Sequence, residues 1–152
     1  SQLDLYPTLV HLAGADPIIT PDGEDLLPLL DEGKTTYLND RTLYWHFPAY
    51  LEAGGHPNEG RDQLFRSRPV SVILQKGWKL IENYEDGTLE LYDLNQDPSE
   101  KQDVSGKYPD KTVQLYEQLN VWKKETNAPV PDRLNPLYKL KQEITSYESK
   151  RI

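Results

Sequence analysis

The chain has 152 residues, of which 36% are hydrophobic and 28% charged, as is typical of a globular domain with a modest core. Its formal net charge of −8 argues against nucleic acid or an anionic membrane as a partner held by long-range attraction. The sequence contains no cysteine, which excludes disulfide bonds and zinc–thiolate sites, and no apolar run approaches the roughly 20 residues that cross a bilayer.

The first predicted element is a helix from Asp4 to Ala13. Its apolar residues recur at helical spacing on one face: Leu5, Leu9 and Leu12. Pro7 lies in the first turn, where its missing N–H costs little, and Gly14 is a natural stop. A short helix with such a stripe is expected to pack against a part of the protein outside these 152 residues. Residues 15–33 are rich in Asp, Pro and Gly and predict a connector.

Four strands are predicted next, at residues 42–47, 69–74, 78–83 and 88–94. Asp86-Gly87 predicts a tight turn that closes the last two strands into a hairpin. Gln75-Lys76-Gly77 predicts a second short turn, so the last three strands form an antiparallel meander. A long loop, residues 49–63, joins the first strand to this meander.

Alternation assigns the strand residues to two faces. In the first strand it places Trp45 and Phe47 on an apolar face and His46 on the opposite one. In the second strand the valines Val70 and Val72 share one face. The tryptophans fall in alternating or helical patterns and are expected in the core: Trp45, Trp78 and Trp122.

The last predicted helix runs from Pro109 to Thr126. Its apolar stripe follows the i, i+4, i+7 pattern: Leu115, Leu119 and Trp122. The prolines in residues 127–136 then predict an extended segment. The expected fold class is therefore α+β, a small antiparallel sheet of about four strands with one long C-terminal helix packed on it.

A series of short motifs along the chain carries a family resemblance. In order they are Asp4-Leu5-Tyr6-Pro7-Thr8-Leu9-Val10 with Leu12-Ala13-Gly14, Asp22-Gly23-Glu24-Asp25-Leu26-Leu27-Pro28-Leu29-Leu30, Leu43-Tyr44-Trp45-His46-Phe47-Pro48, Gly77-Trp78-Lys79-Leu80-Ile81, Leu89-Glu90-Leu91-Tyr92-Asp93-Leu94 and Asp97-Pro98-Ser99-Glu100. No single motif is specific, but their order resembles the C-terminal portion of formylglycine-dependent, arylsulfatase-like sulfatases of the alkaline-phosphatase-like superfamily. The resemblance covers residues 2 to about 138.

The resemblance implies a division of the chain. Residues 1–40 would be the end of the catalytic-domain region with a connector, residues 41–138 the sulfatase C-terminal subdomain, and residues 139–152 a polar tail. The N-terminal helix would be left over from the catalytic domain. The missing N-terminal sulfatase domain is then the expected protein partner.

The resemblance also implies a function for the parent enzyme. It would hydrolyse sulfate esters, with a sulfated glycan or another sulfate ester as substrate, in the periplasm or outside the cell. Formylglycine, made from a cysteine in a Cys-x-Pro-Ser-Arg motif, and calcium are expected in the parent. This chain would hold no cofactor, no metal ligand and no catalytic residue, because the family's catalytic motifs lie upstream of Ser1. Its expected role is to close one side of the substrate cleft.

Four residues are candidates for substrate binding: His46, His56, Arg66 and Arg68. His46 ends a strand before a long loop, where an imidazole could donate to a sulfate or a sugar hydroxyl. His56 is a polar tip of that loop. Arg66, Arg68 and Val70 follow one another at every second position, so in an extended strand their side chains lie on one face. Both arginines are therefore expected along the buried face. There they would pair with acids across the domain interface or line the sulfate cleft.

The alternative to a sulfatase subdomain is a free-standing, non-catalytic module that binds carbohydrate or protein. That alternative predicts an N-terminal helix docked on the chain's own sheet. The sulfatase interpretation predicts instead that Leu5, Leu9 and Leu12 stay partly exposed.

Overall fold

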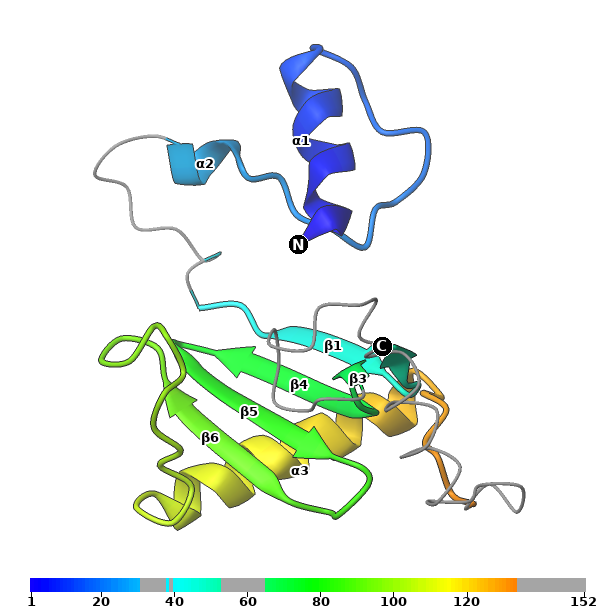
Figure 1. Cartoon of the computed structure of the whole chain (residues 1–152). Coiled ribbons are helices and arrows are strands. Elements are labelled where there is room, and N and C mark those ends of the chain that lie inside the picture. The colour runs from blue at the N-terminus through cyan, green and yellow to red at the C-terminus, as the bar shows by residue number, and fades with distance from the viewer. Residues whose placement is uncertain (31–37, 39, 53–64, 134–152) are drawn as a thin grey trace, which may run out of the picture. The chain divides into compact units, whose positions relative to one another are not determined.

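The computed structural model describes residues 1–30, 38, 40–52 and 65–133 (Figure 1). The chain divides into two compact units, of which the first comprises Ser1–Leu43 with Leu74–Gly77 and the second Tyr44–Ile73 with Trp78–Ile152. The predicted domain limits at residues 40 and 138 stay predictions. No helix within the described residues is long and apolar enough to cross a membrane.

Three short helices lie within the described residues of the first unit. A 3-10 helix, η1 (Gln2–Asp4), leads directly into α1 (Leu5–Leu12), and α2 (Leu27–Leu30) follows the connector. Gly14 adopts a positive φ of 66° just after α1, which confirms the predicted helix and its stop.

The buried residues of η1 and α1 are polar. Asp4 is 1% exposed and accepts hydrogen bonds from the Arg41 guanidinium and, at 2.9 Å, from the backbone N–H of Glu24. The Thr8 hydroxyl donates to the Asp4 carbonyl oxygen at 2.6 Å and accepts from the backbone N–H of Leu26 at 2.9 Å. These bonds hold the connector against the start of the helix.

An adjacent side of α1 carries the leucine stripe, and its residues are exposed: Leu5 by 54%, Leu9 by 61% and Leu12 by 62%. The stripe is thus uncovered within the first unit, and its exposure in the whole chain, which the sulfatase interpretation predicts, stays a prediction.

The second unit is built on a four-stranded sheet with the order β1-β4-β5-β6. Its strands are β1 (Leu43–Phe47), β4 (Val70–Gln75), β5 (Trp78–Asn83) and β6 (Leu89–Asp93). Two further short strands, β2 (Leu51–Glu52) and β3 (Phe65–Ser67), pair antiparallel with each other. The strands β5 and β6 pair antiparallel with Leu80 opposite Leu91, so the predicted hairpin is confirmed.

The turns follow the predicted chemistry. Lys76 and Gly77 both adopt positive φ between β4 and β5, the backbone that a two-residue hairpin turn requires. Gly87 has a φ of 70° between β5 and β6, and Asp86 Oδ1 accepts from the Thr88 backbone N–H at 3.0 Å.

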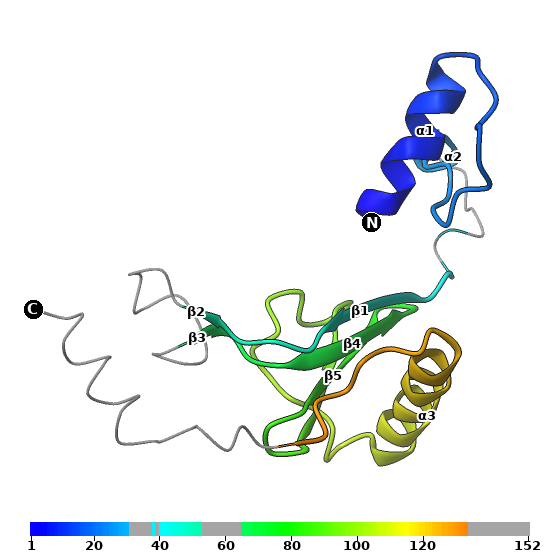
Figure 2. The same cartoon turned by 90° about the vertical axis from the view of Figure 1, so that its right-hand side faces the viewer.

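The helix α3 (Pro109–Glu125) lies across one face of this sheet, as both views show (Figures 1 and 2). Pro109 occupies its first turn, as expected, and Lys123 and Lys124 its last. Residues 128–132 continue without helix or strand, as the prolines predict.

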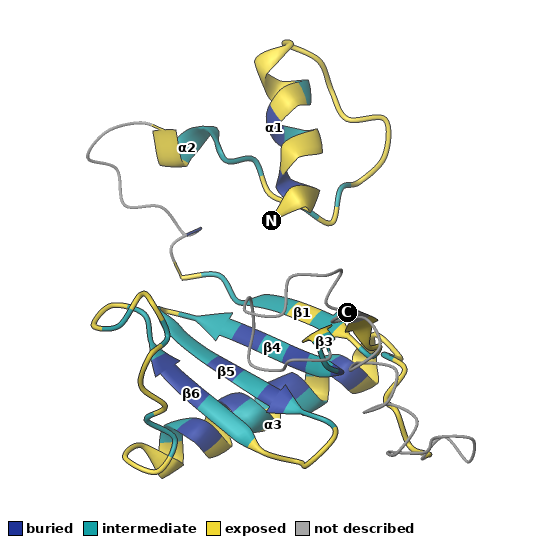
Figure 3. Cartoon of the chain, viewed as in Figure 1, coloured by how far each residue is buried: buried dark blue, intermediate teal, exposed yellow. Residues whose placement is uncertain are grey.

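The core lies between this sheet face and α3 (Figure 3). It consists of five fully buried side chains: Ile73, Leu80, Leu91, Leu115 and Leu119. Each such side chain contributes about 1.5–3 kcal/mol relative to leaving it in water. Trp78 and Trp122 pack against this cluster, as predicted. The α+β fold class is confirmed.

The structure corrects the predicted face of β1. Tyr44 packs against the core and stacks on Trp122 of α3 with ring centroids 4.8 Å apart, whereas Trp45 and Phe47 are 45% and 39% exposed. The two-residue alternation is right, but the buried face is the one assigned to His46. The expectation that Trp45 lies in the core is therefore wrong for this chain. The reason is that both faces of the strand carry aromatic residues, so polarity could not identify the side that α3 covers.

Candidate functional site

His46 lies on the α3 side of the sheet and uses both ring nitrogens within the second unit. Its Nδ1 is 2.7 Å from Ser71 Oγ, and its Nε2 is 2.9 Å from the carbonyl oxygen of Pro129. Ser71 Oγ is in turn 2.6 Å from the Tyr84 hydroxyl oxygen. These contacts join β1, β4, the turn after β5 and the segment after α3.

The three hydrogen bonds form a series that ends at the Pro129 carbonyl oxygen, and this end determines which group donates in each bond. A carbonyl oxygen can only accept, so His46 Nε2 carries the proton and donates to Pro129. In the neutral ring Nδ1 then accepts from the Ser71 hydroxyl, which in turn accepts from Tyr84. Burial raises the pKa of Tyr84 above its ordinary value, so this donor keeps its proton at neutral pH.

A serine beside a histidine is the pairing used in nucleophilic catalysis, but Ser71 does not fit that role. Its side chain has no exposed surface, and its oxygen is shared between His46 and Tyr84. A substrate contact through His46 would require exchanging one of its two bonds. Substrate binding by His46 stays a prediction.

Next to this series of hydrogen bonds lies a buried ion pair that was not predicted from the sequence. Lys123 Nζ is 2.5 Å from Glu82 Oε2, and the two side chains are 9% and 10% exposed. The Lys123 ammonium also lies 5.3 Å from the Tyr84 ring centroid and 5.7 Å from that of Tyr116. Glu82 lies two residues after the buried Leu80 in β5 and therefore on the same face of the strand. Strand alternation could thus have predicted that its carboxylate lies under α3.

A cleft of about 560 Å³ is lined by residues of β3 to β6, and it includes Arg66 and Arg68. These arginines line it together with Val70 and Val72, but Phe65, Ser67 and Pro69 line it as well, so a face shared by Arg66, Arg68 and the valines stays a prediction. The expectation of a buried face is not met, because the fully buried residues of β4 are Ser71 and Ile73, of the opposite parity.

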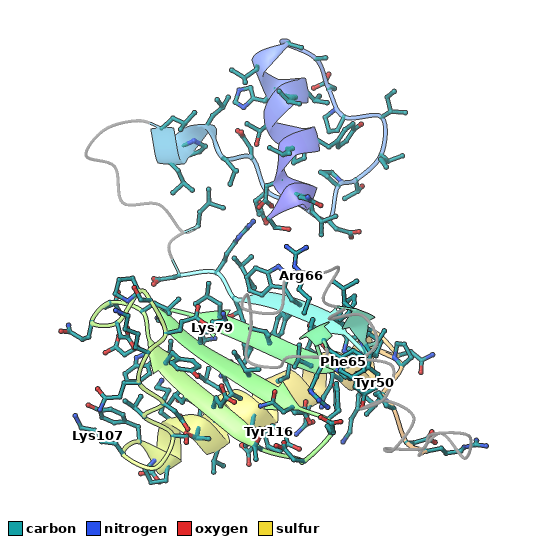
Figure 4. The ribbon with its side chains drawn as sticks, in the orientation of Figure 1. Tyr50, Phe65, Arg66, Lys79, Lys107 and Tyr116 are labelled. Carbon is teal, nitrogen blue, oxygen red and sulfur yellow. The ribbon has the colours of Figure 1, made fainter. Side chains whose placement is uncertain are left out.

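The two arginines differ in their surroundings. Arg68 is half-buried, forms an ion pair with Glu85, and has its guanidinium 5.2 Å from the Phe65 ring centroid and 6.0 Å from that of Tyr50. The Tyr50 hydroxyl also donates to Glu85 at 3.1 Å. Arg66 is exposed, and Figure 4 shows it apart from the labelled Phe65 and Tyr50. Within the described part of the chain, no hydrogen bond or ion pair reaches it.

Carboxylates of the same cleft are fixed by neighbouring side chains. Glu100 accepts from Lys79 Nζ at 2.7 and 2.8 Å. Glu90 accepts from the Tyr92 hydroxyl at 2.7 Å and from Asn83 Nδ2 at 3.1 Å. Glu90 and Tyr92 flank the buried Leu91 in β6, so alternation could have assigned them to this face.

His56 lies outside the described residues, as does the rest of its loop from residue 53 to 64. Within the described ranges no group of three or more histidine, cysteine, aspartate or glutamate residues could hold a metal ion.

Comparison with known proteins gives a consistent result. Residues 1–127 match the family described as N-sulphoglucosamine sulphohydrolase, C-terminal. A sulfatase from Formosa agariphila is 29% identical over 141 residues, which are 84% of this chain and 23% of that protein. Arylsulfatase K from Rattus norvegicus is 31% identical over 122 residues, 78% of this chain and 20% of its own length.

The fold also matches solved structures. The protein BT4656, in complex with its substrate D-glucosamine-2-N,6-O-disulfate, superposes with a TM-score of 0.61 at 26% identity, covering 86% of this chain and 25% of that one. The chain therefore spans only a fifth to a quarter of the length of these relatives.

Proposed function

Because the chain belongs to the C-terminal family of N-sulphoglucosamine sulphohydrolase, we propose that it is the C-terminal subdomain of a sulfatase that hydrolyses sulfate esters. The observation that carries the proposal is the match over residues 1–127, which includes both the first unit and the whole four-stranded sheet with α3. In the parent enzyme the subdomain closes one side of the substrate cleft.

We further propose that the parent acts on a sulfated glycan. Support comes from BT4656, whose bound substrate is a disulfated glucosamine. The remaining three quarters of the parent, including the N-terminal sulfatase domain, would supply the formylglycine nucleophile and the calcium that binds the sulfate. This chain alone is then non-catalytic. The parent would work in the periplasm or outside the cell.

Two measurements test the proposal. The coding sequence upstream of Ser1 is expected to contain a Cys-x-Pro-Ser-Arg or Ser-x-Pro-Ser-Arg motif. The purified parent should release sulfate from glucosamine 6-sulfate, whereas the 152-residue chain should release none. Absence of that motif would contradict the proposal that the parent is a sulfatase. Sulfate release by the isolated chain would contradict the proposal that this chain alone is non-catalytic.

A further inference from the structure

The cleft that Arg66 lines lies on the face of the sheet opposite to the one that carries the core residues. Its floor is apolar and half-buried or buried: Val70, Val72, Ile81 and Tyr92. Residues of β3 and of the β5–β6 turn border it, and the carboxylates Glu90 and Glu100 lie along it. All of these residues belong to the second unit.

The size and composition of the cleft favour a small polar ligand over a protein partner. Its volume of about 560 Å³ lies within the range of roughly 300–1,000 Å³ that is usual for small-molecule sites. The core of a protein–protein interface is depleted of charged residues. This cleft instead carries six of them: Arg66, Arg68, Glu85, Asp86, Glu90 and Glu100.

Most of these charged groups are held in place by other side chains. Arg68 is paired with Glu85, Glu100 with Lys79, and Glu90 accepts from Tyr92. A carboxylate has about four lone-pair sites, so one that accepts one or two hydrogen bonds can still accept from a ligand hydroxyl. Pre-oriented planar acceptors above an apolar floor with a tyrosine ring suit the hydroxyls and the apolar face of a sugar.

Arg66 distinguishes this cleft from a site for a neutral sugar. Its guanidinium is the one charged group of the cleft that no described residue pairs, and a guanidinium binds an oxyanion through two parallel hydrogen bonds. Glu85 and Glu100 are each paired with a cation, so Asp86 and Glu90 are the carboxylates that oppose a second anionic group, because like charges repel across a few ångströms. The charge pattern therefore fits a ligand with a single anion next to Arg66.

We propose that this cleft is a binding site for a sugar unit that carries one sulfate ester, with Arg66 on the sulfate and the carboxylates on the hydroxyls. The proposal rests on the proposed function, which makes sulfated glycans available to the chain. It adds a saccharide site on the sheet of this subdomain, and it predicts a preference for sparse over dense sulfation.

Calorimetric titration of the 152-residue chain tests the site without any hydrolysis. The probes are a glucosamine-containing disaccharide with one 6-O-sulfate, the same disaccharide without sulfate, and its fully sulfated form. The monosulfated form should bind about tenfold more tightly than either of the others, the factor expected for one charge-assisted contact. Equal affinity for all three, tightest binding of the fully sulfated form, or no binding would overturn the proposal.

The variants are Arg66→Gln and, as a matched control, Arg133→Gln, whose side chain is 88% exposed and does not line the cleft. Arg66→Gln should lower affinity for the monosulfated probe about tenfold and leave the unsulfated probe unchanged, and Arg133→Gln should change neither. Equal effects of both variants would reject Arg66 as the anchor.

Nuclear magnetic resonance of the unsubstituted chain gives an independent readout. The monosulfated probe should shift the signals of Val70, Ile81 and Tyr92, and shifts confined to other residues would place the saccharide elsewhere. Binding by the isolated chain but not by the parent would also overturn the proposal, because the rest of the parent chain would then cover the cleft. Because sulfate release by the parent is measured separately, failure of this site leaves the proposed function standing.

Discussion

At the residue scale, the polar groups under α3 are more constrained than those that face solvent. Lys123 and Glu82 are both about nine-tenths buried, and each is the ion-pair partner of the other. His46, Ser71 and Tyr84 form a chain in which every bond has a defined donor. Removing one member leaves its neighbour buried without a partner, which costs more than the bond itself contributes.

The ion pair gives the first prediction. Lys123→Met should destabilise the chain by about 3–5 kcal/mol, because it leaves the Glu82 carboxylate buried and unpaired. Adding Glu82→Leu to that variant should recover most of the loss. Urea unfolding followed by tryptophan fluorescence measures both free energies. A double variant no more stable than Lys123→Met would contradict this account.

His46 gives the second prediction. His46→Phe should lower the free energy of unfolding by about 1–3 kcal/mol, because the Pro129 carbonyl and the Ser71 hydroxyl lose their partner. His46→Gln keeps one donor and one acceptor and should lose less. If both variants keep the stability of the original chain while the parent enzyme loses activity, His46 contacts substrate instead.

Asp4 gives a prediction about pH. Hydrogen bonding to Arg41 holds the pKa of Asp4 well below its usual range. A carboxyl with a depressed pKa stabilises the fold above its ordinary pKa and loses that contribution as pH falls. The first unit should therefore lose stability as pH falls below about 4, and Asp4→Asn should remove this pH dependence. The Glu24 amide signal, whose N–H donates to Asp4, reports the change, and an unchanged pH profile in the variant would contradict it.

Site residues could be predicted from the sequence only in part. Alternation predicted a face shared by Arg66, Arg68, Val70 and Val72, but Pro69 forms a bend between β3 and β4, and the two strands belong to different sheets. It could not show that Glu85 would pair with Arg68, since that contact depends on how the β5–β6 turn folds back over β3. It could not show the partners of His46 either, because Pro129 is 83 residues away in the chain.

At the scale of elements, local signals predicted most of the fold. Gly14, Lys76-Gly77, Gly87 and Pro109 mark turns or helix ends where backbone conformation itself selects the residue. The covered face of β1 was not predictable in this way. The last four of its five residues are all aromatic, so only the position of Trp122 in α3 decides which two face the core.

The leucine stripe of α1 leads to a prediction about association. Leu5, Leu9 and Leu12 are each more than half exposed, so the isolated chain should self-associate. Sedimentation at several concentrations should show this, and changing all three leucines to glutamine should give a monomer. Val113 and Val121, 55% and 54% exposed on α3, are the matched control, and their change to glutamine should have no effect. A chain that is monomeric without any substitution would contradict the prediction.

At the scale of the whole molecule, the two units differ in what stabilises them. The five fully buried apolar side chains all belong to the second unit. Among the described residues of the first unit, the buried ones are Asp4, Thr8 and Leu38. Since apolar burial is the main source of stability, the first unit has little of its own.

The isolated chain should therefore unfold in two steps. All three tryptophans lie in the second unit, so fluorescence follows only that unit. Amide hydrogen exchange in α1 should be fast at urea concentrations that leave the fluorescence unchanged. In the parent enzyme the same amides should be protected. Coincident transitions in the isolated chain would contradict this view.

The bonds of His46 have a consequence for comparing sequences within the family. Residues 44–47 read Tyr-Trp-His-Phe, so a shift of one position still aligns aromatic with aromatic and scores almost as well. Such a shift would exchange the two faces of β1 and remove the histidine from Ser71 and Pro129. An alignment gap inside this strand is therefore physically wrong even where the letters permit it. In this chain, the contact between His46 and Ser71 is what fixes the register of β1 against β4.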